Sequence, residues 1–267
     1  MNGPLLGHTW RAQRTKLLLV STALAIWGFL MPFVYAKFGS QFKTLLASGM
    51  LPKQFAEFGN GDVFSLPGSI ALGFIHPIAI SLVSVFAVGF CAAAVAGEQQ
   101  RGTLEVVLAR PVSRRAVYAT LLIASMGFVG VTIAALLGGS VMGAAFEGIG
   151  GELALRYVPL LWVNGLLLFG SISAIGLAAS VSFDRFAPAL GVTLGTVVIM
   201  YFLEVLGSLW PDAAFLQPYS LFHYLKPKAV LTGAAAPFDF IVLVAVLVAA
   251  MVWALIVFPR RDLAAPS

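Results

Sequence analysis

A single short segment concentrates charged side chains in a chain that otherwise avoids them. Residues 97–115, GEQQRGTLEVVLARPVSRR, contain six of the 27 Asp, Glu, Lys and Arg residues, and the long apolar stretches on either side contain none. A helix over 97–109 would advance by about 100° per residue. It would therefore place Glu98, Arg101 and Glu105 on one face. Carboxylates and a guanidinium on one face form ion pairs and charge-assisted hydrogen bonds, which is chemistry suited to docking a partner protein.

The rest of the segment is patterned for a short amphipathic helix followed by a turn. Thr103 and Leu104 fall on the opposite side of the predicted helix, and Pro111 would end it. Ser113 is placed to cap the next helix, and Arg114 to lie near the phosphate headgroups. A loop that only fixes membrane topology would also need basic residues, although acidic residues contribute little to that effect. Both interpretations, a docking element and a topological loop, stay open on the residues alone.

Residue patterns for catalysis are absent from the sequence. None of the six lysines follows a glycine, so the chain has no Gly-x-x-x-x-Gly-Lys phosphate-binding loop. It has no His-Glu-x-x-His zinc motif and no Gly-x-Ser-x-Gly nucleophile motif, and its three histidines lie far apart in sequence. The only cysteine, Cys91, excludes an intrachain disulfide. We therefore expect no enzyme activity and no metal or cofactor bound by this chain.

The composition indicates a membrane protein. The 267 residues are 60% hydrophobic and 10% charged, with a mean hydropathy of +0.97, whereas soluble domains carry about 25% charged residues. A helix needs about 20 apolar residues to cross a bilayer, and six stretches of the chain provide them. We predict an all-α integral membrane protein that forms one domain over residues 1–267. Its expected spans are about 17–36, 69–96, 116–145, 157–182, 187–209 and 240–259, with outer loops at 37–68 and 210–239.

The distribution of basic residues predicts the orientation in the membrane. Six spans place both termini on one side, where 44 residues contain ten Lys or Arg, whereas the 72 residues of the other side contain six. The positive-inside rule therefore assigns both termini to the cytoplasm. The first stretch is interpreted as a span, because its apolar core is longer than the ~7–15 residues of a signal peptide. The net charge of +5 follows from this bias, and no basic patch interleaved with aromatics indicates nucleic-acid binding.

Three motifs resemble those of type-2 ABC exporter permeases. The first is Glu98-x-x-x-Gly102-Thr103-Leu104-Glu105 followed by Pro111-Val112-Ser113-Arg114. The others are Pro218-Tyr219-Ser220-Leu221-Phe222-His223-Tyr224 in the last outer loop and Arg260-Arg261-Asp262-Leu263 after the sixth span. In that family the first motif follows the second of six spans and forms the coupling helix, which touches a separate ATPase subunit. The resemblance implies ATPase contacts for Glu98, Arg101, Gly102, Thr103 and Glu105, with Pro111 and Arg114 holding the exit of the segment.

The resemblance also implies partners and a pathway. The chain would be the permease subunit of an ATP-driven exporter in a prokaryotic cell membrane, with ATP and Mg bound by two cytoplasmic ATPase subunits. A second permease copy or a homologous permease would complete the transporter within the lipid bilayer, and spans two and five would face it. The candidate pathway residues are Phe86, Phe90, Tyr201, Phe202 and Glu204.

Several alternatives stay open. Glu204 could contact substrate, pair with Lys226 or Lys228, or reach the outer interface. A secondary transporter or channel would need no ATPase but would need buried ionisable residues near the midplane, and a membrane assembly scaffold would need no coupling helix. The long first outer loop departs from the family's pattern, so drug efflux, sodium efflux and maturation of nitrous oxide reductase all stay open as roles of the subgroup.

Overall fold

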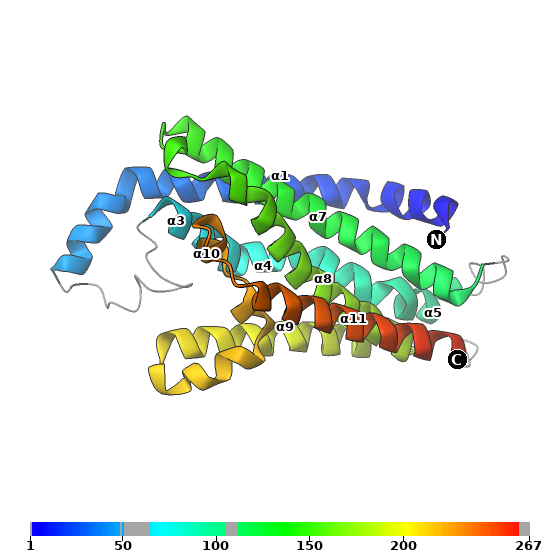
Figure 1. Ribbon diagram of the computed structural model, residues 1–267. Coiled ribbons are helices and arrows are strands. Elements are labelled where there is room, and N and C mark those ends of the chain that lie inside the picture. Colours follow the sequence, from blue (N-terminus) through cyan, green and yellow to red (C-terminus); the bar gives the residue numbers. More distant parts are fainter. Residues whose placement is uncertain (1, 49, 51–64, 105–111, 262–267) are drawn as a thin grey trace.

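The structure is helical throughout the residues it describes. The computed structural model describes residues 2–48, 50, 65–104 and 112–261, and within these ranges it contains helices and no β-strand (Figure 1). Five helices are long and apolar enough to cross a membrane, and a sixth span results if one bent helix pair is counted as one. The predicted all-α membrane fold is therefore confirmed.

The helices agree with the predicted ranges in the second half of the chain and depart from them in the first half. The long elements are α1 (Gly3–Ala47), the pair α3 (Leu66–Ile75) and α4 (Pro77–Ser84), α7 (Arg114–Phe146), α8 (Val158–Ser182), α9 (Phe186–Leu209) and α11 (Pro237–Arg260). Helix α4 continues through two π-helical segments, η1 (Val85–Phe90) and η2 (Ala93–Gly97), into the short α5 (Glu98–Gln100). The short connecting helices are η3 (Gly150–Glu152) and η4 (Leu155–Tyr157) before α8, and η5 (Pro211–Tyr219), η6 (Leu221–Tyr224) and α10 (Pro227–Leu231) before α11.

Helix α1 is longer at both ends than the predicted first span. Near its start, the indole of Trp10 packs against an aromatic ring of α7 with the ring centroids 4.8 Å apart. Towards its other end, Lys37 Nζ pairs with Glu147 Oε2 at 2.7 Å. Contacts with α7 thus extend beyond the apolar stretch and support the helix there. Residues 37–47 of the expected outer loop 37–68 therefore continue the helix, which ends at Ala47.

Glycines let α1 and α7 approach more closely than side chains would allow. An ideal Cβ on Gly28 would lie 2.1 Å from the carbonyl oxygen of Leu136, and one on Gly139 would lie 2.0 Å from that of Ala25. Gly143, one turn further along α7, would place its Cβ 2.5 Å from another α1 carbonyl oxygen. Close packing of this kind holds helices together in lipid, where the hydrophobic effect between them is absent.

The second span is bent. Helix α3 and the helix that starts at α4 meet at 49° across His76, so the prediction of one continuous span over 69–96 is wrong at this point. Pro77 is the cause, because a residue that precedes proline is disfavoured in the helical region, and His76 has φ −67° and ψ 140°. Groups freed by the break find partners nearby. The His76 side chain accepts from the amide two residues ahead at 3.3 Å, and the Trp27 indole donates to the Gly73 carbonyl at 3.0 Å.

Helix α8 lies at the centre of the bundle. Its apolar window is the most buried of the candidate spans, at 67%, against 17% for α9 and 11% for α11. It contacts α7, α9, α11 and both π-helical segments. Figure 1 shows both chain ends and α5 at one end of the bundle, with η5 and α10 at the other. The end that carries α5 and the termini is the one that the distribution of basic residues assigns to the cytoplasm.

The expected outer loop 210–239 is folded against the other end of the bundle. Its η5 segment packs along α9, where Gly207 leaves room for an η5 side chain. Asn164 of α8 holds the next segment, donating to the Tyr224 carbonyl at 3.0 Å and accepting from the Lys226 amide at 3.2 Å. This buried amide group therefore fastens the loop to the centre of the bundle.

Replacing Gly139 by alanine should destabilise the contact between α1 and α7. The new methyl group would overlap the Ala25 carbonyl oxygen, a backbone atom that moves only with its helix, and overpacking costs about 1–3 kcal/mol. Gly138→Ala is the matched control, since nothing lies within 4 Å of its Cβ position. We expect a lower thermal unfolding temperature in detergent for Gly139→Ala alone. Equal unfolding temperatures for the two variants would contradict the close approach of these helices.

Candidate functional site

The second span ends in a left-handed turn at the end of the bundle that carries the termini. Gly102 has φ 72°. Its amide donates to the Gln99 carbonyl at 2.9 Å, and the Thr103 amide donates to the Glu98 carbonyl at 3.0 Å. This pair of bonds is a Schellman motif, in which glycine takes the left-handed position without steric cost. The prediction of one continuous helix over 97–109 is therefore wrong, because the helix ends before Gly102.

Glu98 is the centre of a small polar cluster at this turn. Its carboxylate accepts hydrogen bonds from the Arg101 guanidinium and from the Thr103 hydroxyl. Because the chain turns at the glycine, Thr103 lies beside Glu98 and not on the opposite face as predicted. Arg101 is exposed and Glu98 is half-buried, so the cluster is accessible at this end of the bundle. Glu105 and Pro111, which the sequence also assigns to this site, lie outside the described residues.

Two glutamines tie the turn to residues 184–185, which connect α8 to α9. Gln99 Nε2 donates to Asp184 Oδ1 at 2.7 Å, and the Phe186 amide donates to Gln100 Oε1 at 2.9 Å. The residue before α9 provides no side-chain cap, so Gln100 satisfies an amide that the helix start leaves without a partner. A displacement of the turn would therefore act directly on the start of α9.

The C-terminal end of α11 joins the same set of contacts. Arg261 Nη1 donates to the Val181 carbonyl at 2.7 Å, and its Nη2 donates to Asp184. Arg114, at the start of α7, donates to the Phe258 carbonyl at 3.1 Å and also to the Arg261 carbonyl. These bonds satisfy carbonyl groups that a helix end leaves unpaired. The described contacts of Arg114 are thus with the end of α11.

We refer to these side chains together as the turn network. Its members are Glu98, Gln99, Gln100, Arg101, Thr103, Arg114, Asp184 and Arg261. Four of them, namely Gln99, Gln100, Asp184 and Arg261, are not among the site residues that the sequence predicts. The signal available in the sequence is the polar run that follows directly after an apolar span, which marks the place but not the partners. Ser113, in contrast, caps α7 as predicted, since its Oγ accepts from the Ala116 amide at 3.2 Å.

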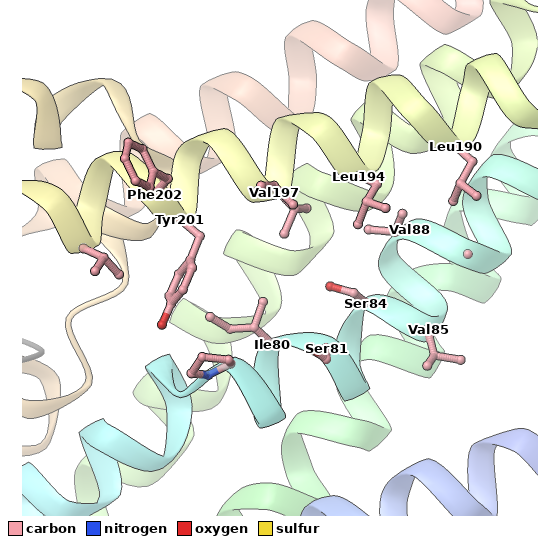
Figure 2. A pocket seen from close by; sticks show the side chains of 14 residues that line it. Ile80, Ser81, Ser84, Val85, Val88, Leu190, Leu194, Val197, Tyr201 and Phe202 are labelled. Atoms are coloured by element: carbon pink, nitrogen blue, oxygen red, sulfur yellow. The ribbon is translucent and has the colours of Figure 1, made fainter.

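A groove of about 570 Å³ lies between the second span and α9 (Figure 2). Tyr201 and Phe202, two of the predicted pathway residues, line it, and Figure 2 shows Tyr201 directed from α9 towards α4. Ser81 and Ser84 add hydroxyl groups to the opposite wall, and the buried Ser84 Oγ has no hydrogen-bond partner within the described ranges. The remaining lining is apolar or glycine: Pro77, Ile80, Val85, Val88, Gly89, Leu190, Leu194, Val197, Val198 and Val205.

Phe86 and Phe90, two further predicted pathway residues, do not line this groove. Both rings pack on Phe128 of α7, with centroid distances of 5.0 Å and 5.3 Å, and Phe86 is fully buried. Residues four apart lie on nearly the same face of a helix. Phe86 and Phe90 share the face towards α7, whereas Val85 and Gly89 share the face towards the groove. The two phenylalanines therefore anchor the second span to α7.

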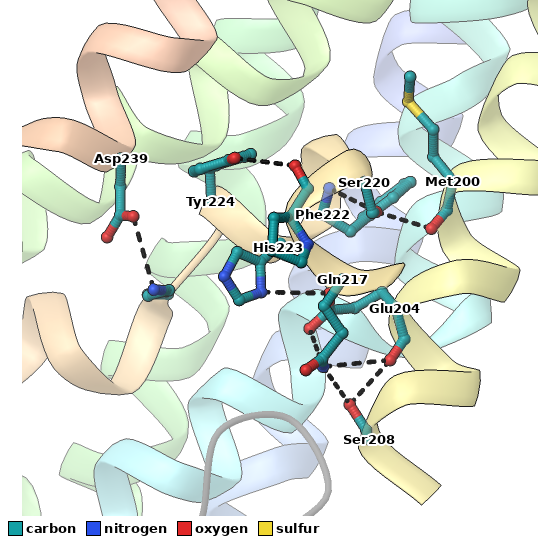
Figure 3. Close-up of polar contacts among 11 residues, drawn as sticks. Met200, Glu204, Ser208, Gln217, Ser220, Phe222, His223, Tyr224 and Asp239 are labelled. Atoms are coloured by element: carbon teal, nitrogen blue, oxygen red, sulfur yellow. Dashed lines mark hydrogen bonds and ion pairs between the residues drawn. The ribbon is translucent and has the colours of Figure 1, made fainter. Parts of the chain in front are cut away.

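Glu204 points away from the groove and into the folded outer loop (Figure 3). Its Oε1 accepts from Gln217 Nε2 at 3.2 Å, and Gln217 also donates to Ser208 Oγ at 3.1 Å. Its Oε2 faces His223 Nδ1 at 3.5 Å, but neither atom forms a hydrogen bond within the described part of the chain. The carboxylate thus neither lines the groove nor extends to the outer interface, because it is enclosed by the loop that packs on α9.

Burial, and to a smaller extent two neighbouring charges, set the pKa of His223. Lys226 Nζ pairs with Asp239 Oδ1 at 3.5 Å, so this lysine is paired with Asp239 where the sequence allowed a pair with Glu204. Burial lowers the pKa of His223, the positive charge of Lys226 lowers it further, and Asp239 opposes the shift. His223 is therefore neutral near neutral pH, and its contact with Glu204 is not an ion pair in that state.

One family model matches nearly the whole chain. The family is described as ABC-2 family transporter protein, and the match covers residues 11–263. The chain belongs to the ABC-2 transporter family. The predicted resemblance to type-2 ABC permeases is thereby confirmed, and no curated protein matches the chain. As an ABC-2 permease the chain is a multi-pass membrane subunit of an ABC transporter, and the family implies an ATPase partner.

Acid should destabilise the ABC-2 permease through His223. Because its pKa is lowered in the folded protein, the unfolded chain binds the proton first as the pH falls below about 6.5. The stability is therefore highest above this value and falls below it, by about 1.4 kcal/mol for each unit that separates the two pKa values. We expect the unfolding temperature of His223→Gln to vary less with pH than that of the wild type.

The measurement is a series of thermal unfolding curves in detergent from about pH 8 to pH 5, the range in which histidine titrates. His8→Gln is the control, since His8 is exposed and its replacement leaves the outer loop intact. If His223→Gln keeps the wild-type dependence on pH, the neutral buried state of His223 is wrong.

Proposed function

We propose that this ABC-2 permease is the membrane-spanning subunit of an ATP-driven exporter and that its ATPase subunit docks on the turn network. The observation that carries the proposal is the set of bonds from one accessible turn to three other parts of the bundle. Gln99 and Gln100 reach the start of α9, and Arg261 with Arg114 extends the contacts to α11 and α7. A partner bound at this turn would thus act on several spans together.

The exposed cluster has the chemistry that protein docking requires. Glu98, Arg101 and Thr103 offer a carboxylate, a guanidinium and a hydroxyl, and Gly102 lets a partner approach the backbone closely. In this proposal Glu105 extends the contact, while Pro111 and Arg114 hold the exit towards α7. Hydrogen bonds to charged groups are the stronger ones and need specific geometry, so such a contact would select one partner surface.

Energy would be supplied by the partner and not by this chain. The sequence lacks a phosphate-binding loop, so in this proposal two cytoplasmic ATPase subunits bind ATP and Mg and carry out hydrolysis. The chain itself would be a non-catalytic subunit in a prokaryotic cell membrane, with both termini in the cytoplasm. A bound partner shifts a conformational equilibrium only if it binds one state better. The ATPases must therefore contact the turn differently with and without ATP.

The groove between the second span and α9 is the candidate substrate pathway. Its lining is largely apolar, and Tyr201, Ser81 and Ser84 contribute hydroxyl groups, which suits an apolar or amphipathic molecule with a polar group. Helix α9 forms one wall and is only 17% buried along its apolar window. A second copy of the permease, or a homologous permease, would cover this face and close the groove into a pathway between the two chains.

Reversing the charges of Glu98 and Glu105 should uncouple the ATPase from the permease. Like charges placed opposite one another cost several kcal/mol, and about 1.4 kcal/mol is a factor of ten in affinity. We expect Glu98→Lys with Glu105→Lys to weaken co-purification of the Walker-A-containing ATPase at least about tenfold. The amount of inserted permease should stay unchanged, as measured in the membrane fraction.

Glu152→Lys with Asp212→Lys is the matched control, because it reverses two acidic residues at the opposite end of the bundle. This variant should bind the ATPase as the wild type does. If the Glu98 and Glu105 variant still binds ATPase and hydrolyses ATP at the wild-type rate, docking at the turn is wrong. Transport by a permease that reproducibly lacks any ATPase would instead favour a secondary transporter.

A further inference from the structure

The part of the second span that joins the groove to the turn network is not a regular α-helix. Its two π-helical segments follow α4: η1 still lines the groove through Val85, Val88 and Gly89, and η2 lies between η1 and α5, which begins the turn. A π-helical turn contains an extra residue and pairs backbone groups five residues apart. Such a turn disrupts the regular ladder of the helix, and the backbone groups affected must find other partners when no water is present.

At η2, a single side chain supplies hydrogen-bond partners for the backbone groups that the π-helical turn leaves unpaired. The hydroxyl of Ser180, on α8, accepts hydrogen bonds from the Val95 amide at 3.0 Å and the Ala96 amide at 2.9 Å. It also donates to the Ala92 carbonyl at 2.8 Å. A serine hydroxyl has one donor and two acceptor positions, so all of them are used on the backbone of the second span. Ser180 is fully buried, which excludes water as a substitute.

The surroundings of Ser180 allow the second span to lie directly against α8. One turn earlier on α8, an ideal Cβ on Gly176 would lie 2.9 Å from Cys91 Cβ and 3.2 Å from the Ala87 carbonyl oxygen. Next to Ser180, Ala92 and Ala96 form a small buried cluster with alanines of α8 and α9. Small side chains provide few steric obstacles to a change of register. The hydrogen bonds of Ser180 are therefore the specific contacts that favour the π-helical arrangement.

A change between π-helical and α-helical pairing would alter the register of the chain on one side of the segment. In an α-helix one residue corresponds to a rotation of about 100° and a rise of about 1.5 Å. Such a change would therefore turn the groove wall on α4 relative to the turn network. We infer that Ser180 is a positioning residue that holds this π-helical hinge, through which movement of the ATPase-docking turn reaches the groove. This inference rests on the proposed docking function.

The test measures the labelling of a cysteine in the groove while nucleotide binds to the ATPase at the other end of the second span. Ser81 is exposed on α4 and lines the groove, so Ser81→Cys provides a reporter that reacts with N-ethylmaleimide. The only native cysteine, Cys91, is fully buried, and the chain without Ser81→Cys measures its background. We expect the labelling rate of the permease–ATPase complex to change when a non-hydrolysable ATP analogue is added.

The reporter chain that also carries Ser180→Ala should still bind the ATPase. Its nucleotide-dependent change in labelling rate should be smaller than that of the reporter chain alone by about fivefold or more. Ser180→Thr, which keeps a hydroxyl, should restore the change, and Ser180→Val, which has the shape of threonine without the hydroxyl, should not. Ser140→Ala is the matched control, since the buried Ser140 hydroxyl donates within its own helix, α7, to the Leu136 carbonyl at 3.0 Å. That variant should behave as the reporter alone.

The outcomes separate the inference from the proposal on which it rests. If Ser180→Ala, or Ser180→Val where the alanine variant does not assemble, keeps the full nucleotide-dependent change, the hinge role is overturned while docking stands. If the reporter chain with Ser180 intact neither binds an ATPase nor responds to nucleotide, the docking function fails and the inference fails with it. Loss of the response in Ser140→Ala as well would also overturn the inference, because the effect would then not be specific to Ser180.

Discussion

Every backbone amide and carbonyl of a membrane-spanning segment needs a partner within the protein, and this constraint explains the irregular places in this chain. At each of them a side chain or a turn supplies the missing bonds. His76 and Trp27 do so around the Pro77 bend, and Ser180 does so at η2. Arg114 completes the carbonyls at the end of α11. The departures from regular helix are therefore specific features, each with its own side chain.

The same constraint concentrates polar residues on the central helix. Asn164, Ser171 and Ser180 of α8 are buried, and all three bond to backbone outside α8: the outer loop, α11 and the second span respectively. Helix α8 thus fixes the positions of its neighbours by hydrogen bonds at three levels of the bundle. Helices α9 and α11, in contrast, are weakly buried within the chain.

The sequence was sufficient to predict the range of a helix where a single physical quantity determines that range. Uninterrupted apolar length predicted α8, α9 and α11 within a few residues, because the bilayer sets that length. The bend at Pro77 also has a local cause and was open to prediction, since proline restricts the residue before it. The join of α1 to the helical segment that follows it is different, because the contact of Lys37 with Glu147 pairs residues far apart in sequence.

The candidate site was only partly predictable, because part of its geometry depends on contacts between residues far apart in sequence. Glycine at position 102 marks the end of a helix, yet the amphipathic pattern of charged and apolar residues favoured a helix that continues through it, and the left-handed geometry decided against this. Tyr201 and Phe202 line the groove, whereas Phe86 and Phe90 face α7, and the packing of the helices decides which neighbour each face meets. The partners of Gln99 and Ser180 lie more than 80 residues away in sequence. Such pairs follow from helix packing and carry no local signature.

These contacts make α8 the fixed reference for movement of the second span. Near the turn, Gln99 bonds to Asp184 directly after α8, and higher in the bundle Ser180 holds η2. Helix α9, the other wall of the groove, begins directly after residues 184–185 and is bonded to Gln100. A force at the turn therefore acts on both walls of the groove, on one through the π-helical segments and on the other through the start of α9. Because α8 is the most buried span, relative movement of the two walls disturbs less packing than movement of α8 itself. In the proposed mechanism, docking at the turn would accordingly change the width of the groove.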